Sequence, residues 1–82
     1  MISVLFFAQL REQLQCEKLT LELPAGSSVT ALREQLIALN PAWLTFLTSD
    51  KLLFSVNQTL VKTSHLIHDG DEVAFFPPVT GG

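Results

Sequence analysis

The sequence has few of the residue types that build disulfides and metal clusters. Its 82 residues contain one cysteine, Cys16, which cannot form an internal disulfide or hold a zinc or iron–sulfur centre by itself. A ferredoxin, which needs four cysteine ligands, is therefore excluded. Because Lys18 is the only basic residue near it, we expect Cys16 to be an inert thiol.

Positive charge is also scarce, and long apolar runs are missing. Five Lys and Arg stand against eight Asp and Glu, a net charge of −3, and the basic residues are too scattered to neutralise several phosphates. The longest apolar runs, Val4 to Ala8 and Leu36 to Leu39, are far shorter than the roughly 20 residues of a membrane span. We expect no nucleic-acid partner and no membrane association. The absence of a basic leader and of paired cysteines favours a mature chain in a reducing cytoplasm.

No set of residues forms a recognisable catalytic or metal site. His65 and His68 lack a neighbouring cysteine and carboxylate set, so we expect solvated loop histidines and no bound metal. The carboxylates of Asp69, Asp71 and Glu72 cluster where a turn precedes a strand, a normal place for solvated acids. We assign them no role, and we expect the chain to bind no cofactor itself.

The length predicts one domain with a fully packed core. With 82 residues and 48% hydrophobic composition, most apolar side chains are needed for a single core, which leaves little room for a bulky cofactor. We predict a globular domain over residues 1–76 and a flexible tail over residues 77–82.

The first half of the chain predicts two strands and a helix. Residues 2–8 are apolar on both faces, and residues 18–23 alternate Leu with polar residues, so both are expected to be strands. We interpret residues 9–17 as the loop of a hairpin, although Leu10 to Leu14 allow a helical turn. Ser27 or Ser28 is expected to cap a helix from Val29 to about Asn40, which ends before Pro41.

The second half predicts three short strands. Residues 42–51 are ambiguous, and we expect one helical turn packed by Trp43. Residues 52–56 and 59–62 form a predicted hairpin around an Asn-Gln turn. Residues 72–76 form the last strand, which Pro77 and Pro78 end.

This order of elements predicts an α+β fold. The strands at the two ends of the chain are apolar on both sides, so we expect them to lie parallel at the centre of a mixed sheet of about five strands. One main helix packs on one face. This arrangement is the β-grasp, or ubiquitin-like, fold.

The end of the sequence carries the main chemical signal. Val79, Thr80, Gly81 and Gly82 follow the two prolines, and residues without a Cβ can enter a very narrow channel. Six extended residues span at most about 20 Å. A terminal carboxylate is a poor acyl donor, and the chain has no phosphate-binding loop, so a partner must activate it with ATP.

Three segments carry a resemblance to a known family. Residues 69–82 (DGDEVAFFPPVTGG), 4–12 and 56–61 resemble the small sulfur-carrier subunit of molybdopterin synthase, a ubiquitin-like family. The resemblance implies that an ATP-dependent adenylating enzyme activates Gly82, which then becomes a thiocarboxylate. The tail would deliver sulfur to a pyranopterin precursor in the large synthase subunit, within a heterotetramer. This chain would be a non-catalytic subunit.

Alternation along the strands predicts a docking surface. If Ser3 and Glu72 face solvent, then Leu5, Phe7 and Phe76 share that face, away from the helix. Leu60 is a weaker candidate for the same surface, and Arg11 is expected to add a charge at its rim. Alternatively, a loop or the 42–51 segment folds over these side chains.

Three alternatives to this function remain open at this point. A sulfur carrier for thiamine thiazole synthesis has the same fold and tail, although the length and the residues from Phe75 to Pro78 argue against it. A ubiquitin-like modifier would be joined to lysines through Gly82. A plain β-grasp binding module would have an inert tail.

Overall fold

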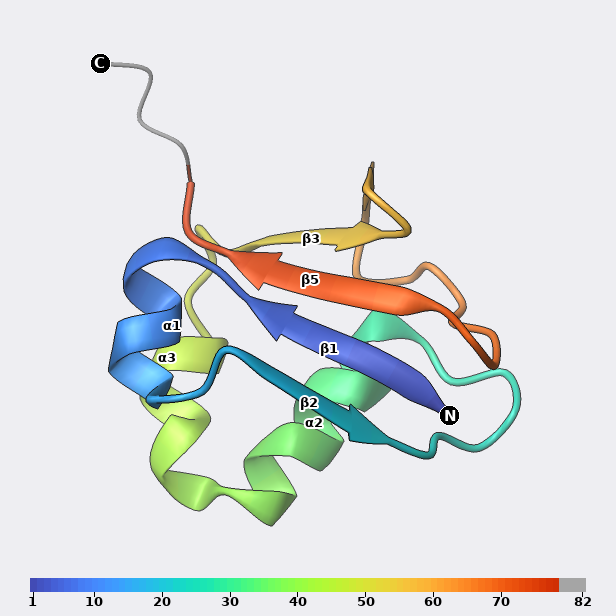
Figure 1. Ribbon diagram of the computed structural model, residues 1–82, viewed down its shortest axis with the longest axis horizontal. Helices are drawn as coiled ribbons and strands as arrows, with labels where there is room; N and C mark the ends of the chain where they lie inside the picture. Colours follow the sequence, from blue (N-terminus) through green and yellow to red (C-terminus); the bar gives the residue numbers. More distant parts are fainter. Residues whose placement is uncertain (79–82) are drawn as a thin grey trace.

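A single mixed sheet of five strands organises the protein (Figure 1). The computed structural model describes residues 1–78. The strand order is β2-β1-β5-β3-β4. The elements, in chain order, are β1 (Ile2–Phe6), α1 (Ala8–Leu14), β2 (Lys18–Leu21), α2 (Val29–Leu39), the short 3-10 helix η1 (Pro41–Trp43), α3 (Leu44–Leu47), β3 (Leu53–Val56), β4 (Thr59–Val61) and β5 (Glu72–Phe76).

The first and last strands pair in parallel at the centre of the sheet. Val4 lies opposite Val73 and Phe6 opposite Phe75, while β2 and β3 flank this pair in antiparallel orientation. Central strands are covered on both edges, which suits segments with apolar residues on both faces. The predicted parallel pair and the β-grasp fold are confirmed.

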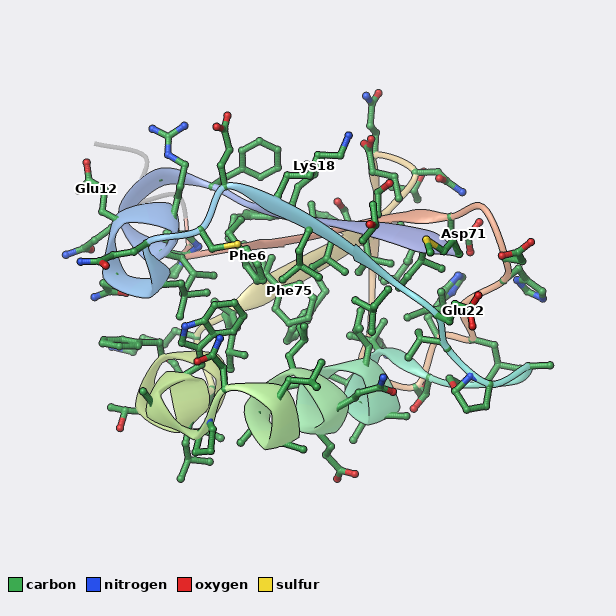
Figure 2. All side chains as sticks on the ribbon, turned by 60° about the horizontal axis from the view of Figure 1, so that its bottom comes forward. Phe6, Glu12, Lys18, Glu22, Asp71 and Phe75 are labelled. Atoms are coloured by element: carbon green, nitrogen blue, oxygen red, sulfur yellow. The ribbon has the colours of Figure 1, made fainter. Side chains whose placement is uncertain are left out.

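Aromatic rings fill the space between the sheet and the helices, which lie on one face (Figures 1 and 2). Phe6 and Phe75 are fully buried, and their ring centroids lie 5.7 Å apart in an edge-to-face arrangement. Trp43 packs on Phe6 at 5.4 Å, and Phe54 packs on Phe75 at 5.1 Å. Edge-to-face pairs at such distances add to the stabilisation from burial.

The connection between β1 and β2 is a helix, so its interpretation as a loop is wrong. Leu10 and Leu14 lie one turn apart on α1 and are both buried, which explains why this polar segment becomes helical. Strand β1 ends at Phe6, two residues earlier than predicted, because Ala8 turns the chain with a φ of +55°. The expected antiparallel pairing of β1 with β2 is confirmed.

Local signals placed α2 and the hairpin correctly. The Ser28 hydroxyl caps α2 by accepting a hydrogen bond from the Ala31 backbone N–H at 3.2 Å. Asn57 and Gln58 both have positive φ, +50° and +70°, as a two-residue hairpin turn requires.

Residues 42–51 join the helical layer. Trp43 is 9% exposed, and α3 follows it as a single turn beside α1 and α2 (Figure 1). The helical turn predicted here is confirmed. Because this segment packs on the helical face, it does not cover the opposite face of the sheet. Within residues 1–78, no helix has the length and apolar character of a membrane span.

Asp71 joins the loop before β5 to the hairpin turn. Its carboxylate accepts hydrogen bonds from the backbone N–H of His68 at 2.8 Å and from the Asn57 side-chain amide at 3.0 Å. The same Asn57 accepts one from the backbone N–H of Glu72 at 3.0 Å. These donors, led by the backbone N–H of His68, outweigh desolvation and lower the pKa of Asp71.

We expect the Asp71 carboxylate to make stability depend on pH. Because its folded-state pKa is lowered, its contribution is complete above the unfolded value of about 3.9 and disappears as the pH falls through the folded value. In urea unfolding followed by Trp43 fluorescence, Asp71→Asn should be less stable than wild type at pH 7, with a difference that shrinks towards pH 3. Glu34→Gln, an exposed control, should change little, and an equal loss for Asp71→Asn at both pH values would contradict this role.

Candidate protein-docking site

The sheet face opposite the helices carries apolar side chains that no helix covers. Along β1, Ile2, Val4 and Phe6 are buried beneath the helices, whereas Ser3 and Leu5 on the other face are half-buried. We call this second side the open face. Lys18, which pairs with Leu5, points away from the helices on this side (Figure 2).

Strand register extends the open face across the sheet. Cross-strand partners point to the same side, and the register pairs Leu5 with Ala74 and Leu53 with Phe76. Ser55 links Ala74 to Leu60 on β4. We define the open-face cluster by its apolar members, with Phe7 at the end of β1: Leu5, Phe7, Leu53, Leu60, Ala74 and Phe76.

Several members of this cluster are exposed to solvent. Phe7 is 45% exposed and Leu60 is 65% exposed, and Leu5, Leu53 and Phe76 are half-buried. Adjacent exposed apolar side chains are unfavourable in water and are typical of protein interfaces. The predicted placement of Leu5, Phe7, Leu60 and Phe76 on one face is confirmed.

A backbone hydrogen bond holds Phe7 beside the end of β5. Its N–H donates a hydrogen bond to the carbonyl oxygen of Phe75 at 3.2 Å, which continues the β1–β5 pairing by one residue. The left-handed turn at Ala8 then directs the chain into α1. As a result Phe7, Ala8, Phe76 and Pro77 line an open apolar hollow at the end of β5.

Arg11 lies on α1, one turn after Phe7. Its backbone N–H donates to the carbonyl oxygen of Phe7 at 3.3 Å, and its guanidinium lies 4.0 Å from the Glu17 carboxylate. Both side chains are exposed, so this ion pair is weak, and the role of Arg11 at the rim of the surface stays a prediction.

Two members of the cluster were missed by sequence reasoning. Ala74 follows the same alternation as Glu72 and Phe76, so the signal was present, but its side chain is small and 5% exposed. Leu53 joins the cluster through its pairing with Phe76, and that register became visible only in the folded sheet.

The remaining predictions concern the C-terminal residues, the thiol of Cys16 and metal binding. Val79, Thr80, Gly81 and Gly82 lie outside the described residues, so their role and the tail over residues 77–82 stay predictions. Cys16 is half-buried, and its thiol lies 3.7 Å from the carbonyl oxygen of Lys18. Over residues 1–78, no group of three His, Cys, Asp or Glu side chains lies close enough to hold a metal ion.

Phe6 and Phe7 lie on opposite faces of the sheet, so their truncation should change the free energy of unfolding by very different amounts. We expect Phe6→Ala to lower the free energy of unfolding by about 3–5 kcal/mol, because it leaves a cavity against Trp43 and Phe75. Phe7→Ala should cost less than about 1 kcal/mol, as for other surface positions. Urea unfolding followed by Trp43 fluorescence measures both. A loss above about 2 kcal/mol for Phe7→Ala would show that Phe7 supports the core.

Comparison with known proteins agrees with this architecture. The chain is 50% identical to the molybdopterin synthase sulfur carrier subunit of Escherichia coli over 84 aligned positions, with 100% of both chains covered. It is 44% identical to that of Haemophilus influenzae over 82 positions, again with 100% of both covered.

Solved structures of the same fold include archaeal and bacterial proteins. SAMP1 from Haloferax volcanii superposes with a TM-score of 0.85 at 23% identity, covering 99% of this chain and 98% of that one. A chain in a complex of subunits 1 and 2 of the molybdopterin-converting factor from Helicobacter pylori has a TM-score of 0.69 at 22% identity, covering 99% of this chain and 97% of that one. The model of the ThiS family matches residues 4–82, and this chain therefore belongs to the ThiS family.

Proposed function

We propose that this protein is the sulfur carrier subunit of a molybdopterin synthase, with Gly82 as the residue that carries sulfur. One observation supports this proposal above the others. The apolar hollow lined by Phe7 and Phe76 lies at the end of β5, the last strand before Gly82 in the sequence. The full-length match to molybdopterin synthase sulfur carriers favours this function over a carrier for thiazole synthesis.

The proposal places the reacting group outside the folded domain. The core is filled by apolar side chains, including the fully buried Phe6 and Phe75. Pro77 and Pro78 follow β5, and their fixed φ favours an extended chain. Glycines at the end of the sequence suit a narrow channel in a partner enzyme. In this proposal the chain is the substrate of its partners and supplies no catalytic side chain.

Activation of Gly82 needs an ATP-dependent adenylating enzyme. A carboxylate oxygen of Gly82 attacks the α-phosphorus of ATP, and pyrophosphate leaves. Hydrosulfide then attacks the acyl carbon, and AMP leaves with the bonding electron pair. The product is a thiocarboxylate, whose sulfur is a stronger nucleophile than a carboxylate oxygen. ATP is bound by the activating enzyme and not by this chain.

Transfer takes place in the large synthase subunit. The thiocarboxylate sulfur displaces an oxygen substituent from an electrophilic carbon of the pyranopterin precursor, and this substituent leaves with the bonding electron pair. Water then hydrolyses the acyl–sulfur bond, which leaves a thiolate on the pterin and restores the Gly82 carboxylate. Docking through the open face would hold the tail near the partner's active site and raise its effective concentration there. Use of one face for both partners makes the two complexes mutually exclusive. Two carriers and two large subunits would form the heterotetramer.

Intact mass measures the proposed modification directly. After incubation with ATP, sulfide and the adenylating enzyme, the protein should gain about 16 Da, because one oxygen is replaced by sulfur at the activated chain end. Deletion of Gly82 should abolish the gain, and Cys16→Ser should retain it.

Three results would contradict the sulfur-carrier function. A gain that maps to Cys16 would indicate persulfide chemistry at the thiol. Isopeptide bonds from Gly82 to lysines of other proteins, in place of a thiocarboxylate, would indicate a ubiquitin-like modifier. A binding module with an inert tail would keep its activity after deletion of Gly82.

Binding to the large subunit tests the open face. Phe76→Ala should weaken binding by about 2 kcal/mol, because a large aromatic side chain at the centre of an interface contributes strongly. Leu39→Ala is a matched control, since Leu39 is 67% exposed but lies at the end of α2, on the helical side. Titration calorimetry compares the two variants, and equal losses would argue against docking through the open face.

A further inference from the structure

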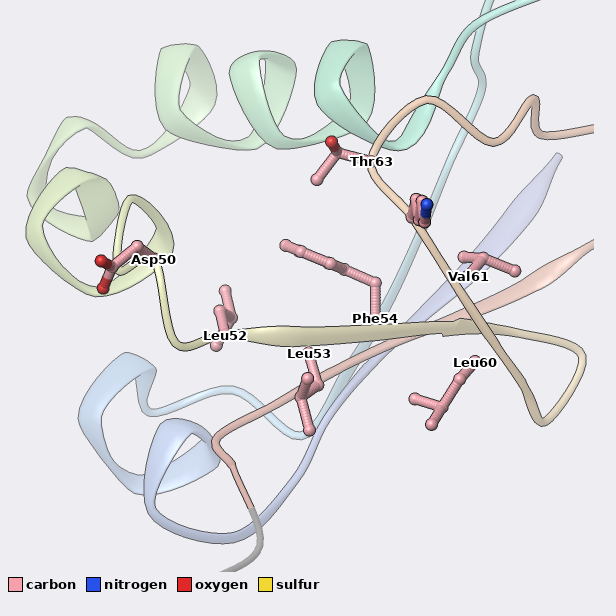
Figure 3. Close-up of a pocket in the computed structure, with 8 residues that line it drawn as sticks. Asp50, Leu52, Leu53, Phe54, Leu60, Val61 and Thr63 are labelled. Carbon is pink, nitrogen blue, oxygen red and sulfur yellow. The ribbon is translucent and has the colours of Figure 1, made fainter.

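The two arms of the β3–β4 hairpin diverge and leave a notch at the edge of the sheet. Pairing between these strands stops at Phe54 and Val61, although β3 continues to Leu53, which pairs with Phe76. Beyond Val61 the chain turns towards α2, where the carbonyl oxygen of Thr63 accepts a hydrogen bond from the Thr30 N–H at 3.0 Å. The space between the arms is open, and Figure 3 shows the side chains that line it.

The apolar part of the notch is continuous with the open-face cluster. Leu53 and Leu60 line the notch and also belong to the cluster. In Figure 3 these two side chains lie on one side of β3, and Phe54 lies on the other side, towards the helices. A partner protein bound to the open-face cluster would therefore also contact the notch.

Two cations lie at the notch. Lys62 lines it, and the Arg33 guanidinium lies 5.9 Å from the centroid of the Phe54 ring, which forms part of its wall. Lys51 is next in the sequence to Asp50 and Leu52, which both line the notch.

These cations have no carboxylate partner within the part of the chain that the structure describes. The ion pairs formed between residues 1 and 78 involve the Met1 ammonium with Asp69, Arg11 with Glu17, and His68 with Asp71. Asp50 is the one described carboxylate that lines the notch. An apolar notch bordered by unpaired cations is complementary to an acidic segment that also carries aliphatic side chains.

We propose that the notch binds an acidic segment of the large subunit, with an aliphatic side chain between Leu53 and Leu60 and a carboxylate facing Lys62. This inference rests on the proposed function, because it extends docking beyond the open-face cluster. The aliphatic contact would bury apolar surface that water now reaches, and the carboxylate would pair with cations at the rim. Rim charges chiefly accelerate association and select the partner.

Loss of the Lys62 charge tests the inference against a matched control. Lys62→Gln and Ala38→Glu each lower the net charge by one, but Ala38 is exposed on α2, on the helical side of the sheet. In titrations with the large subunit at low salt, Lys62→Gln should weaken binding about threefold relative to Ala38→Glu, the effect of one exposed ion pair. The difference should shrink at high salt, where exposed charges are screened.

Two further variants refine the outcome. Lys62→Arg should keep the affinity of the wild type, and Asp50→Asn should raise affinity because it removes the carboxylate that lines the notch. Equal losses for Lys62→Gln and Ala38→Glu would overturn the notch inference while leaving docking through the open face intact. No binding by the wild-type protein would overturn both the notch inference and the proposed partner.

Discussion

The structure depends on the contact between the first and last strands. Parallel pairing of β1 with β5 brings Phe6 against Phe75, and Trp43 and Phe54 complete the cluster of rings from the helical layer and from β3. This contact joins segments that lie near opposite ends of the sequence. It also fixes the end of β5 against the end of β1, so the point where the tail leaves the domain is held by the core itself.

The same pairing produces the open face. Side chains of neighbouring residues in a strand point to opposite faces, so a strand that places Phe6 in the core places Leu5 on the open face, and Phe75 and Phe76 are separated in the same way. The core and the open face therefore depend on the same strand register. A shift of one residue in either central strand would exchange buried and exposed residues, so in the proposed function partner recognition depends on correct strand pairing.

The two faces of the sheet differ in how they are covered. One side is covered by helices and contributes to the core, and the other carries the open-face cluster. In the proposed function this division suits a carrier, because the protein must bind and leave successive enzymes while its chemistry stays at the end of a short tail. The notch at the β3–β4 edge would extend that open side with charge, which suits recognition that is selective and reversible.

The sequence by itself determined the strands at the two ends of the chain, their central position, the α2 cap at Ser28 and the positive-φ turn at Asn57, because each depends on local chemistry or alternation. It also determined the glycine ending on which the proposed chemistry depends. The sequence allowed either a loop or a helical turn at Leu10 to Leu14, and tertiary structure decided for a helix over Ala8–Leu14, because it buries both leucines. Tertiary structure alone placed Leu53 beside Phe76 and opened the notch near Lys62, because strand register and the divergence of hairpin arms arise from contacts between distant segments.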